Sequence, residues 1–373
     1  MKSPRLVAAA TLSSVLILAA CSDADDSADT TSADGATSTS DVAAGTSDAA
    51  ESTSDAAGST ADDTSETSAP AADATITAEP AGEGAVSIES AERLAAELLT
   101  RAAEATQADG DELTTAINSA YRGPARQAAV AADRLEGVTG EPEEVDPDDL
   151  PEPNVLAVSR SDDEAPTLIV VQTVPEDGLP ELHLIAKPAD IDNYRIIWSA
   201  PMLPGTEVGT FDRRSIGSPV VREGGGDFVT TPGTALNDLA DYIDYPPSGA
   251  PDVRTNGYAP QVRQNASEQA GAVSAQASFL ERNRVSGGNT YTIYQEDGSG
   301  ITFGVLERES VFNVRSGSRL IPPDTFTAFA DDSSITDSAT LDTLVFVAMH
   351  LPAEDGSPEM IAAREQIVGA SGS

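Results

Sequence analysis

Thr290–Val314 reads TYTIYQEDGSGITFGVLERESVFNV, and this stretch decides the fold of the second half of the chain. Its β-branched and aromatic residues predict a strand over 290–295 and a longer strand over 301–314. The Glu-Asp-Gly-Ser-Gly segment between them has the composition of a hairpin turn. Arg308 and the glutamate on either side of it interrupt the apolar pattern, so we expect the longer strand to bend or bulge there.

Apolar segments on both sides of this stretch complete a unit of helix and sheet. Residues 341–351 are mostly apolar and predict a further strand. Upstream, an apolar stripe at helical spacing predicts one long helix over 259–284. The stripe consists of Val262, Ala266, Val273, Ala277 and Leu280.

The preceding residues, 86–250, follow the same order. An apolar stripe with helical period predicts a first helix, and two shorter helices follow it as far as Leu135. The stripe comprises Leu94, Leu98, Ala102 and Ala105. Strands are predicted at 155–160, 167–174, 182–187 and 194–199, and a helix begins at Thr231 and ends before Tyr245.

The predicted fold class is therefore α+β, with two successive units of helix plus antiparallel sheet over 86–250 and 251–373. A disordered acidic stalk precedes them. The order of elements loosely resembles that of NTF2-like domains. That resemblance implies a cone-shaped sheet with a pocket between sheet and helix.

The N-terminus has the layout of a secretory signal. Lys2 and Arg5 are followed by the apolar run 6–20, which is too short to remain as a membrane-spanning helix. Residues 1–20 are therefore predicted to be a signal peptide.

Leu18-Ala19-Ala20-Cys21 ends this signal and resembles a bacterial lipobox. The resemblance implies cleavage before Cys21 and a diacylglycerol thioether on its sulfur. Two acyl chains suffice for stable attachment, so the predicted location is the extracytoplasmic face of the cell membrane. The alternative is ordinary secretory cleavage, which would leave Cys21 unmodified.

Cys21 is the only cysteine in the chain. Once it is acylated, the mature protein has no thiol for a disulfide, a nucleophile or a metal ligand. No other stretch reaches the length of a membrane span, so we expect the rest of the mature chain to be soluble.

Residues 21–85 have the composition of a disordered linker. Asp, Ser, Thr, Ala and Gly dominate, and 22–84 contain no Lys, Arg or aromatic residue. Such a segment buries too little apolar area to fold, so it is expected to hold the folded part away from the membrane. The net charge of −41 excludes nucleic acid as a partner, because nucleic-acid binding needs a basic surface.

Three short motifs resemble a group of uncharacterised actinobacterial lipoproteins. They are the lipobox, Ala120-Tyr121-Arg122-Gly123-Pro124-Ala125, and Thr231-Pro232 followed by Leu239-Ala240-Asp241-Tyr242. The resemblance implies the same location and no chemistry.

Few residues suggest catalysis. His183 and His350 each lack a second His or Cys at ligand spacing, so no zinc site is predicted. Glu307 and Glu309 share one face of a strand, where we expect them to be exposed. We therefore assign no catalytic residue, no metal site and no cofactor.

Three aromatic residues on predicted strands are the candidates to line a ligand pocket: Tyr194, Trp198 and Tyr291. In a domain with few aromatic residues, such side chains also serve simply as core.

The sequence therefore favours a non-enzymatic interaction or assembly module of the cell envelope, with an envelope protein as its partner. One alternative is a small-ligand-binding accessory lipoprotein for transport or sensing, with a closed cavity near Trp198 or Tyr291. A further alternative is a hydrolase, in which two carboxylates would meet His183 or His350 in that cavity.

Overall fold

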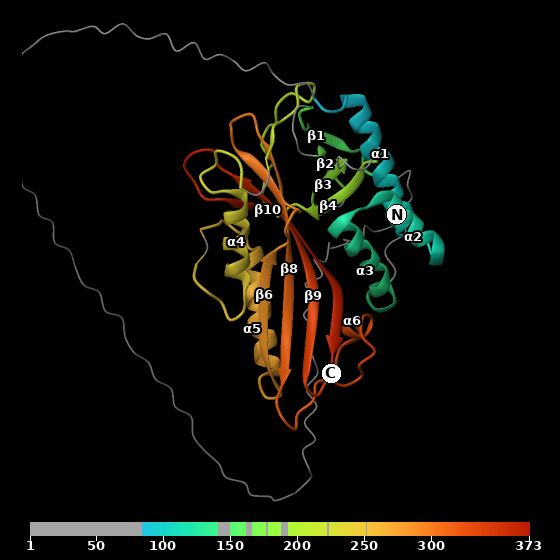
Figure 1. Cartoon of the computed structure of the whole chain (residues 1–373), viewed down its shortest axis with the longest axis vertical. Helices are drawn as coiled ribbons and strands as arrows, with labels where there is room; N and C mark the ends of the chain where they lie inside the picture. The colour runs from blue at the N-terminus through green and yellow to red at the C-terminus, as the bar shows by residue number, and fades with distance from the viewer. Residues whose placement is uncertain are drawn as a thin grey trace, which may run out of the picture. The chain divides into compact units, whose positions relative to one another are not determined.

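The computed structural model describes residues 84–140, 150–161, 166–176, 178–187, 193–221, 224–250 and 252–373, which belong to one compact unit (Figure 1). The predicted signal peptide 1–20, Cys21 and nearly all of the linker 21–85 lie outside these described residues. The predicted class is confirmed, because the unit combines α-helices with antiparallel sheets.

Three helices open the described part of the chain: α1 (Ile88–Ala105), α2 (Gly110–Ala120) and α3 (Gly123–Thr139). They match the three helices expected from the apolar stripes. Ser87 caps α1, since its side chain accepts a hydrogen bond from the backbone N–H of Ser90. A glycine in left-handed conformation begins both α2 and α3, which separates them sharply from the preceding helix.

The first sheet has four antiparallel strands in sequence order (Figure 1). They are β1 (Asn154–Val158), β2 (Thr167–Thr173), β3 (Glu181–Lys187) and β4 (Arg195–Pro201). All four predicted strands are confirmed within two residues. One face packs against α1, where the small side chains of Ala91 and Ala95 bring the helix close to Ile169 and Ile185.

The second sheet has six strands in the order β10-β9-β8-β7-β5, with β6 also paired to β8. They are β5 (Val220–Val221), β6 (Ala277–Val285), β7 (Tyr291–Tyr294), β8 (Gly300–Val314), β9 (Ser338–Leu351) and β10 (Glu359–Gly372). The predicted β7–β8 hairpin and β9 are confirmed. The register of β8 with both β6 and β9 continues unbroken through Arg308, so the predicted bulge is absent.

One predicted helix is wrong in its second half. The helix α5 (Tyr258–Val273) ends at Val273, and the residues that follow form β6. Ala277 and Leu280 fit a helical stripe by spacing, but burial from Ala277 onward alternates with period two. Pairing with β8 decided the outcome.

Two helices cover one face of the second sheet: α4 (Pro232–Ile243) and α5 (Figure 1). The short helix α6 (Asp324–Thr327) lies near the end of β10. None of the helices in the described ranges is both long enough and apolar enough to cross a bilayer.

Trp198 joins the two sheets. Its ring packs edge-on against Phe303, with 5.0 Å between centroids, and its indole N–H donates to the carbonyl of Gly304 at 3.0 Å. One buried hydrophobic cluster contains residues of both sheets, so the predicted units 86–250 and 251–373 share a core.

Candidate functional site

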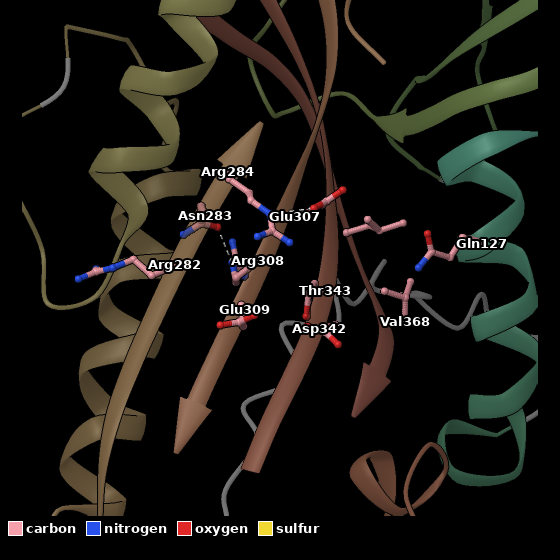
Figure 2. A pocket seen from close by; sticks show the side chains of 11 residues that line it. Gln127, Arg282, Asn283, Arg284, Glu307, Arg308, Glu309, Asp342, Thr343 and Val368 are labelled. Atoms are coloured by element: carbon pink, nitrogen blue, oxygen red, sulfur yellow. Dashed lines mark hydrogen bonds and ion pairs between the residues drawn. The ribbon is translucent and has the colours of Figure 1, made fainter. Parts of the chain in front are cut away.

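A groove of about 380 Å³ lies on the second sheet, on the face opposite α4 and α5 (Figure 2). We call it the docking groove. Strand β6 contributes Arg282 and Arg284, β8 contributes Glu307 and Glu309, and β9 contributes Asp342. Gln127 of α3 and Val368 of β10 stand at the other side of the groove.

Strand register places these charges on one face. Side chains alternate between the two faces of a sheet, so the odd-numbered residues of β8 point together into the groove. Arg284 lies opposite Glu307, Arg282 lies opposite Glu309, and Glu309 lies opposite Asp342.

The arginines leave two of the carboxylates unpaired. Arg284 Nε lies 2.9 Å from Glu307 Oε2, and this pair is well formed. Arg282 instead points away from Glu309 (Figure 2). It pairs with Asp244, with 3.2 Å between Nη1 and Oδ2. Within the described part of the chain, Glu309 and Asp342 have no ion-pair partner.

Glu309 and Asp342 therefore form a like-charge pair directly across two strands, an arrangement that destabilises a sheet. Partial burial raises the pKa of Asp342, and the charge of Glu309 raises it further, although Arg284 acts in the opposite direction. Arg284 is paired with Glu307 and offsets the charge of Glu309 and Asp342 only in part, so a further cationic group would stabilise the groove.

Behind the groove, on the helix-covered face, Arg308 holds a buried ionic network. Its Nε lies 3.7 Å from Glu281 Oε1 and 3.1 Å from the side-chain oxygen of Asn283, and its Nη1 lies 3.0 Å from Glu365 Oε2. Tyr258 of α5 also donates a hydrogen bond to Glu365. This network fixes β6, β8 and β10 beneath α5.

The pKa values in this network follow burial and the charge of Arg308. Burial raises the pKa of Glu281, although Arg308 opposes that effect. Burial also acts to raise the pKa of Glu365, but Arg308 and the hydrogen bond from Tyr258 together outweigh it and the pKa is lowered. Burial is the main reason why the pKa of Tyr258 is well above its usual value.

The structure brings together two of the three predicted ligand-lining residues. Trp198 and Tyr291 line a hollow of about 240 Å³ between β4, β7 and the start of α3; we call it the aromatic hollow. Pro124, Leu184 and Phe303 complete its apolar wall. Tyr194 lies elsewhere, against the cluster between α1 and the first sheet.

His183 lies within a chain of hydrogen bonds that runs from Thr173 to Glu181. Its Nε2 is 2.9 Å from Thr173 Oγ1, its Nδ1 is 2.8 Å from Ser199 Oγ, and Ser199 Oγ donates to Glu181 Oε1 at 2.8 Å. The hydroxyl hydrogen of Ser199 is directed to Glu181, so Ser199 can only accept a hydrogen bond from His183. His183 therefore donates through Nδ1 and accepts from Thr173 at Nε2.

This arrangement does not favour catalysis by Ser199. A serine nucleophile donates its proton to the base, whereas here the imidazole donates to the serine. Burial lowers the pKa of His183, so the ring is neutral and both nitrogens are occupied. His350 is half-buried on β9, beside Glu359 across the strand pair.

Glu307 and Glu309 share the face expected from their spacing. Asp342, Arg284 and the Arg308 network were not predicted from the sequence. Asp342 could have been recognised from the sequence, because it is the only carboxylate in the mostly apolar predicted strand 341–351. The residue opposite Asp342 depends on the register between β8 and β9. The sequence does not specify this register, because Glu309 and Asp342 are 33 positions apart in the chain.

Across the described residues, no group of three or more His, Cys, Asp or Glu side chains is placed to hold a metal ion. Comparisons with protein-family models, curated proteins and solved structures found no match to the chain.

Proposed function

We propose that the chain is a lipid-anchored, extracytoplasmic interaction module of the cell envelope, and that its docking groove binds a basic segment of a partner protein. The unpaired carboxylates of Glu309 and Asp342 carry this proposal. A lysine or arginine of the partner would relieve their repulsion.

The groove suits a protein segment better than a small molecule. It is open, and it lies along a sheet whose exposed side chains are positive on β6 and negative on β8 and β9. An extended segment with basic residues at every second position would present them to the same face.

A peptide-binding experiment tests this function. The probe is a labelled eight-residue peptide with lysine at alternate positions, and its binding to the full-length chain is followed by fluorescence anisotropy at several salt concentrations. We expect Glu309→Gln with Asp342→Asn to weaken binding by about tenfold or more, since it removes charged partners.

The matched control removes the same charge elsewhere. Glu104→Gln with Asp111→Asn changes two exposed carboxylates of α1 and α2. If both double variants weaken binding equally, the attraction is only that of an acidic protein for a basic peptide, and the docking groove loses its support.

Small-ligand binding is the second candidate function, and the aromatic hollow supports it. Trp198 and Tyr291 both line it, and its volume of about 240 Å³ is slightly below the range typical of ligand pockets. A ligand screen by thermal shift tests it, with Tyr291→Ala as the variant that should abolish any response.

A further inference from the structure

A separate, smaller pocket lies between the N-terminal helices and the strands. It has a volume of about 90 Å³, and α2, α3, β4, β9 and β10 all contribute to it. The residues that matter here are Tyr121, Ala125, Ala128, Ser199, Phe346 and Arg364. None of them lines the docking groove or the aromatic hollow.

Alanines make up much of the wall formed by α3, and Asp133 and Glu136 of the same helix also line the pocket. Ala125, Ala128 and Ala132 recur at helical spacing, so their methyl groups face the pocket together. Phe346 of β9 forms the opposite apolar surface. Because alanine side chains are short, they leave space between α3 and the sheet. This space is the pocket.

Arg364 is the unusual residue of this pocket. It lies on β10 opposite Phe346, and its side chain is only half-exposed. Among the described residues it forms no ion pair and no side-chain hydrogen bond. By contrast, Arg308, which is the buried arginine of β8, is paired with Glu281 and Glu365.

The surrounding polar groups leave this guanidinium available. The Glu181 carboxylate accepts a hydrogen bond from Ser199, and among the described residues it forms no ion pair with Arg364. His183 is neutral and fully hydrogen-bonded, so it does not bring a second positive charge. Burial raises the pKa of Tyr121, whose hydroxyl therefore keeps its proton and is able to donate.

We propose that this pocket binds the carboxylate of a small organic acid, held by the Arg364 guanidinium and the Tyr121 hydroxyl, with a short apolar chain against the alanines of α3. We call it the carboxylate pocket. A guanidinium presents two parallel N–H donors that match the two oxygens of a carboxylate.

The size of the pocket limits the ligand. A cavity of about 150 Å³ holds benzene, so 90 Å³ has room for a chain of only a few carbon atoms. The alanines of α3 and the ring of Phe346 favour an aliphatic chain over a polar one. The class is thus a short-chain aliphatic monocarboxylate.

The test is a titration of the full-length chain with sodium butyrate, read by isothermal titration calorimetry. Butyramide has nearly the same shape without the charge and serves as the control ligand. We expect butyrate to bind and butyramide to bind at least tenfold more weakly, because hydrogen bonds between charged groups are the stronger ones.

Substitutions of Arg364 and Tyr121 test whether butyrate binds at this pocket. Arg364→Gln should weaken butyrate binding by about tenfold to a hundredfold, and Tyr121→Phe by less, since only one neutral donor is lost. Arg315→Gln changes an exposed arginine away from the pocket and should leave binding unchanged. Arg364→Lys keeps the charge without the paired donors and should give intermediate affinity, which provides a second variant if Arg364→Gln does not fold.

Three results would overturn the proposal. One is equal affinity of Arg364→Gln and the unmodified chain for butyrate. Another is equal affinity for butyrate and butyramide. The third is a failure of acetate, propionate and butyrate to bind, including the case in which inorganic phosphate binds instead. The basic-peptide experiment uses other residues, so its outcome does not decide this one.

Discussion

Arg308 connects three strands and a helix through one guanidinium. It faces Glu281 on β6 and Glu365 on β10, and Tyr258 of α5 donates to the same Glu365. Only 8% of the side chain of Arg308 or Glu281 is exposed, so neither charge has water as a substitute partner. An arginine in the middle of a strand thus needs no bulge, because the neighbouring strands supply its counter-charges.

Removing this guanidinium should be costly. We expect Arg308→Leu to lower the free energy of unfolding by about 3 kcal/mol or more, since it leaves buried carboxylates without a cation. Denaturant unfolding followed by circular dichroism measures the loss. Arg315→Leu, at an exposed position, should change stability by less than about 0.5 kcal/mol. Similar losses in both variants would show that the network does not stabilise the fold.

His183 should make stability depend on pH. Burial lowers its folded pKa below the usual 6.5, so the unfolded chain binds a proton more readily than the folded one. Above pH 6.5 the neutral ring contributes its full stabilisation. This contribution is lost as the pH falls below 6.5 and through the folded-state pKa of His183. The raised pKa of Glu281 acts with the opposite sign in acid, so it could mask this trend in a single protein.

A comparison of variants isolates the effect of His183. Free energies of unfolding are measured from pH 8 to pH 5 for the unmodified chain and for His183→Asn. We expect the unmodified chain to lose stability relative to the variant as the pH falls below 6.5. A difference that is constant with pH would mean that His183 is not held neutral by the fold.

Sequence reasoning succeeded for residues whose neighbours are local in the chain. The shared face of Glu307 and Glu309 follows from a period of two, which is a property of one strand. The position of Asp342 opposite Glu309, and of Glu365 beside Arg308, follows from pairing between strands. Those partners were not predictable because no short-range signal sets the register.

At the scale of secondary-structure elements, the conformation of the segment between β4 and β5 depends on one glycine. Gly217 has a φ of 81°, and a Cβ there would lie 2.9 Å from the carbonyl oxygen of Ser159. This close approach lets Ser218 donate to the carbonyl of Val158 at 2.8 Å, and Arg160 to that of Ser218 at 3.2 Å.

Gly217→Ala should therefore destabilise the protein in two ways. The left-handed conformation costs an alanine roughly 1 kcal/mol, and the contact with Ser159 adds to it. Gly205→Ala is the matched control, because Gly205 has a φ of 79° and open space around it. Thermal unfolding should show a clearly larger loss for Gly217→Ala. Equal losses would mean that the backbone contact has no energetic role.

The junction between α5 and β6 shows why an element was misassigned. Ala277 and Leu280 continue the stripe of Val262, Ala266 and Val273, so a helical period fits the whole segment. Pairing with β8 over nine residues outweighs that local preference. The strand β10 was not predicted either, because small and charged residues over its length hide its alternation.

For the whole molecule, the α+β class was predictable and the shared core was not. Each run of helices and strands shows its period in sequence, but contact between the two sheets is made by Trp198, Phe303 and Phe346. These residues are up to 148 positions apart in the chain. The likeness to NTF2-like domains stays a prediction.

The proposed anchor predicts where the protein is found in the cell. Cys21→Ser removes the only thiol, so we expect the protein to leave the membrane fraction without change in its fold. Fractionation with a high-salt wash measures the location, and circular dichroism of the released protein checks the fold. Retention of the Cys21→Ser protein in washed membranes would contradict lipid anchoring.

Zero-length carbodiimide crosslinking in the protein's own cells tests the docking groove most directly. The reagent joins a carboxylate to a lysine that touches it, and mass spectrometry identifies the linked peptides. We expect one main partner, joined through its lysines to Glu309 or Asp342, and loss of that partner in the Glu309→Gln, Asp342→Asn double variant. A partner joined only at carboxylates outside the groove and retained by the double variant would contradict the proposed docking site.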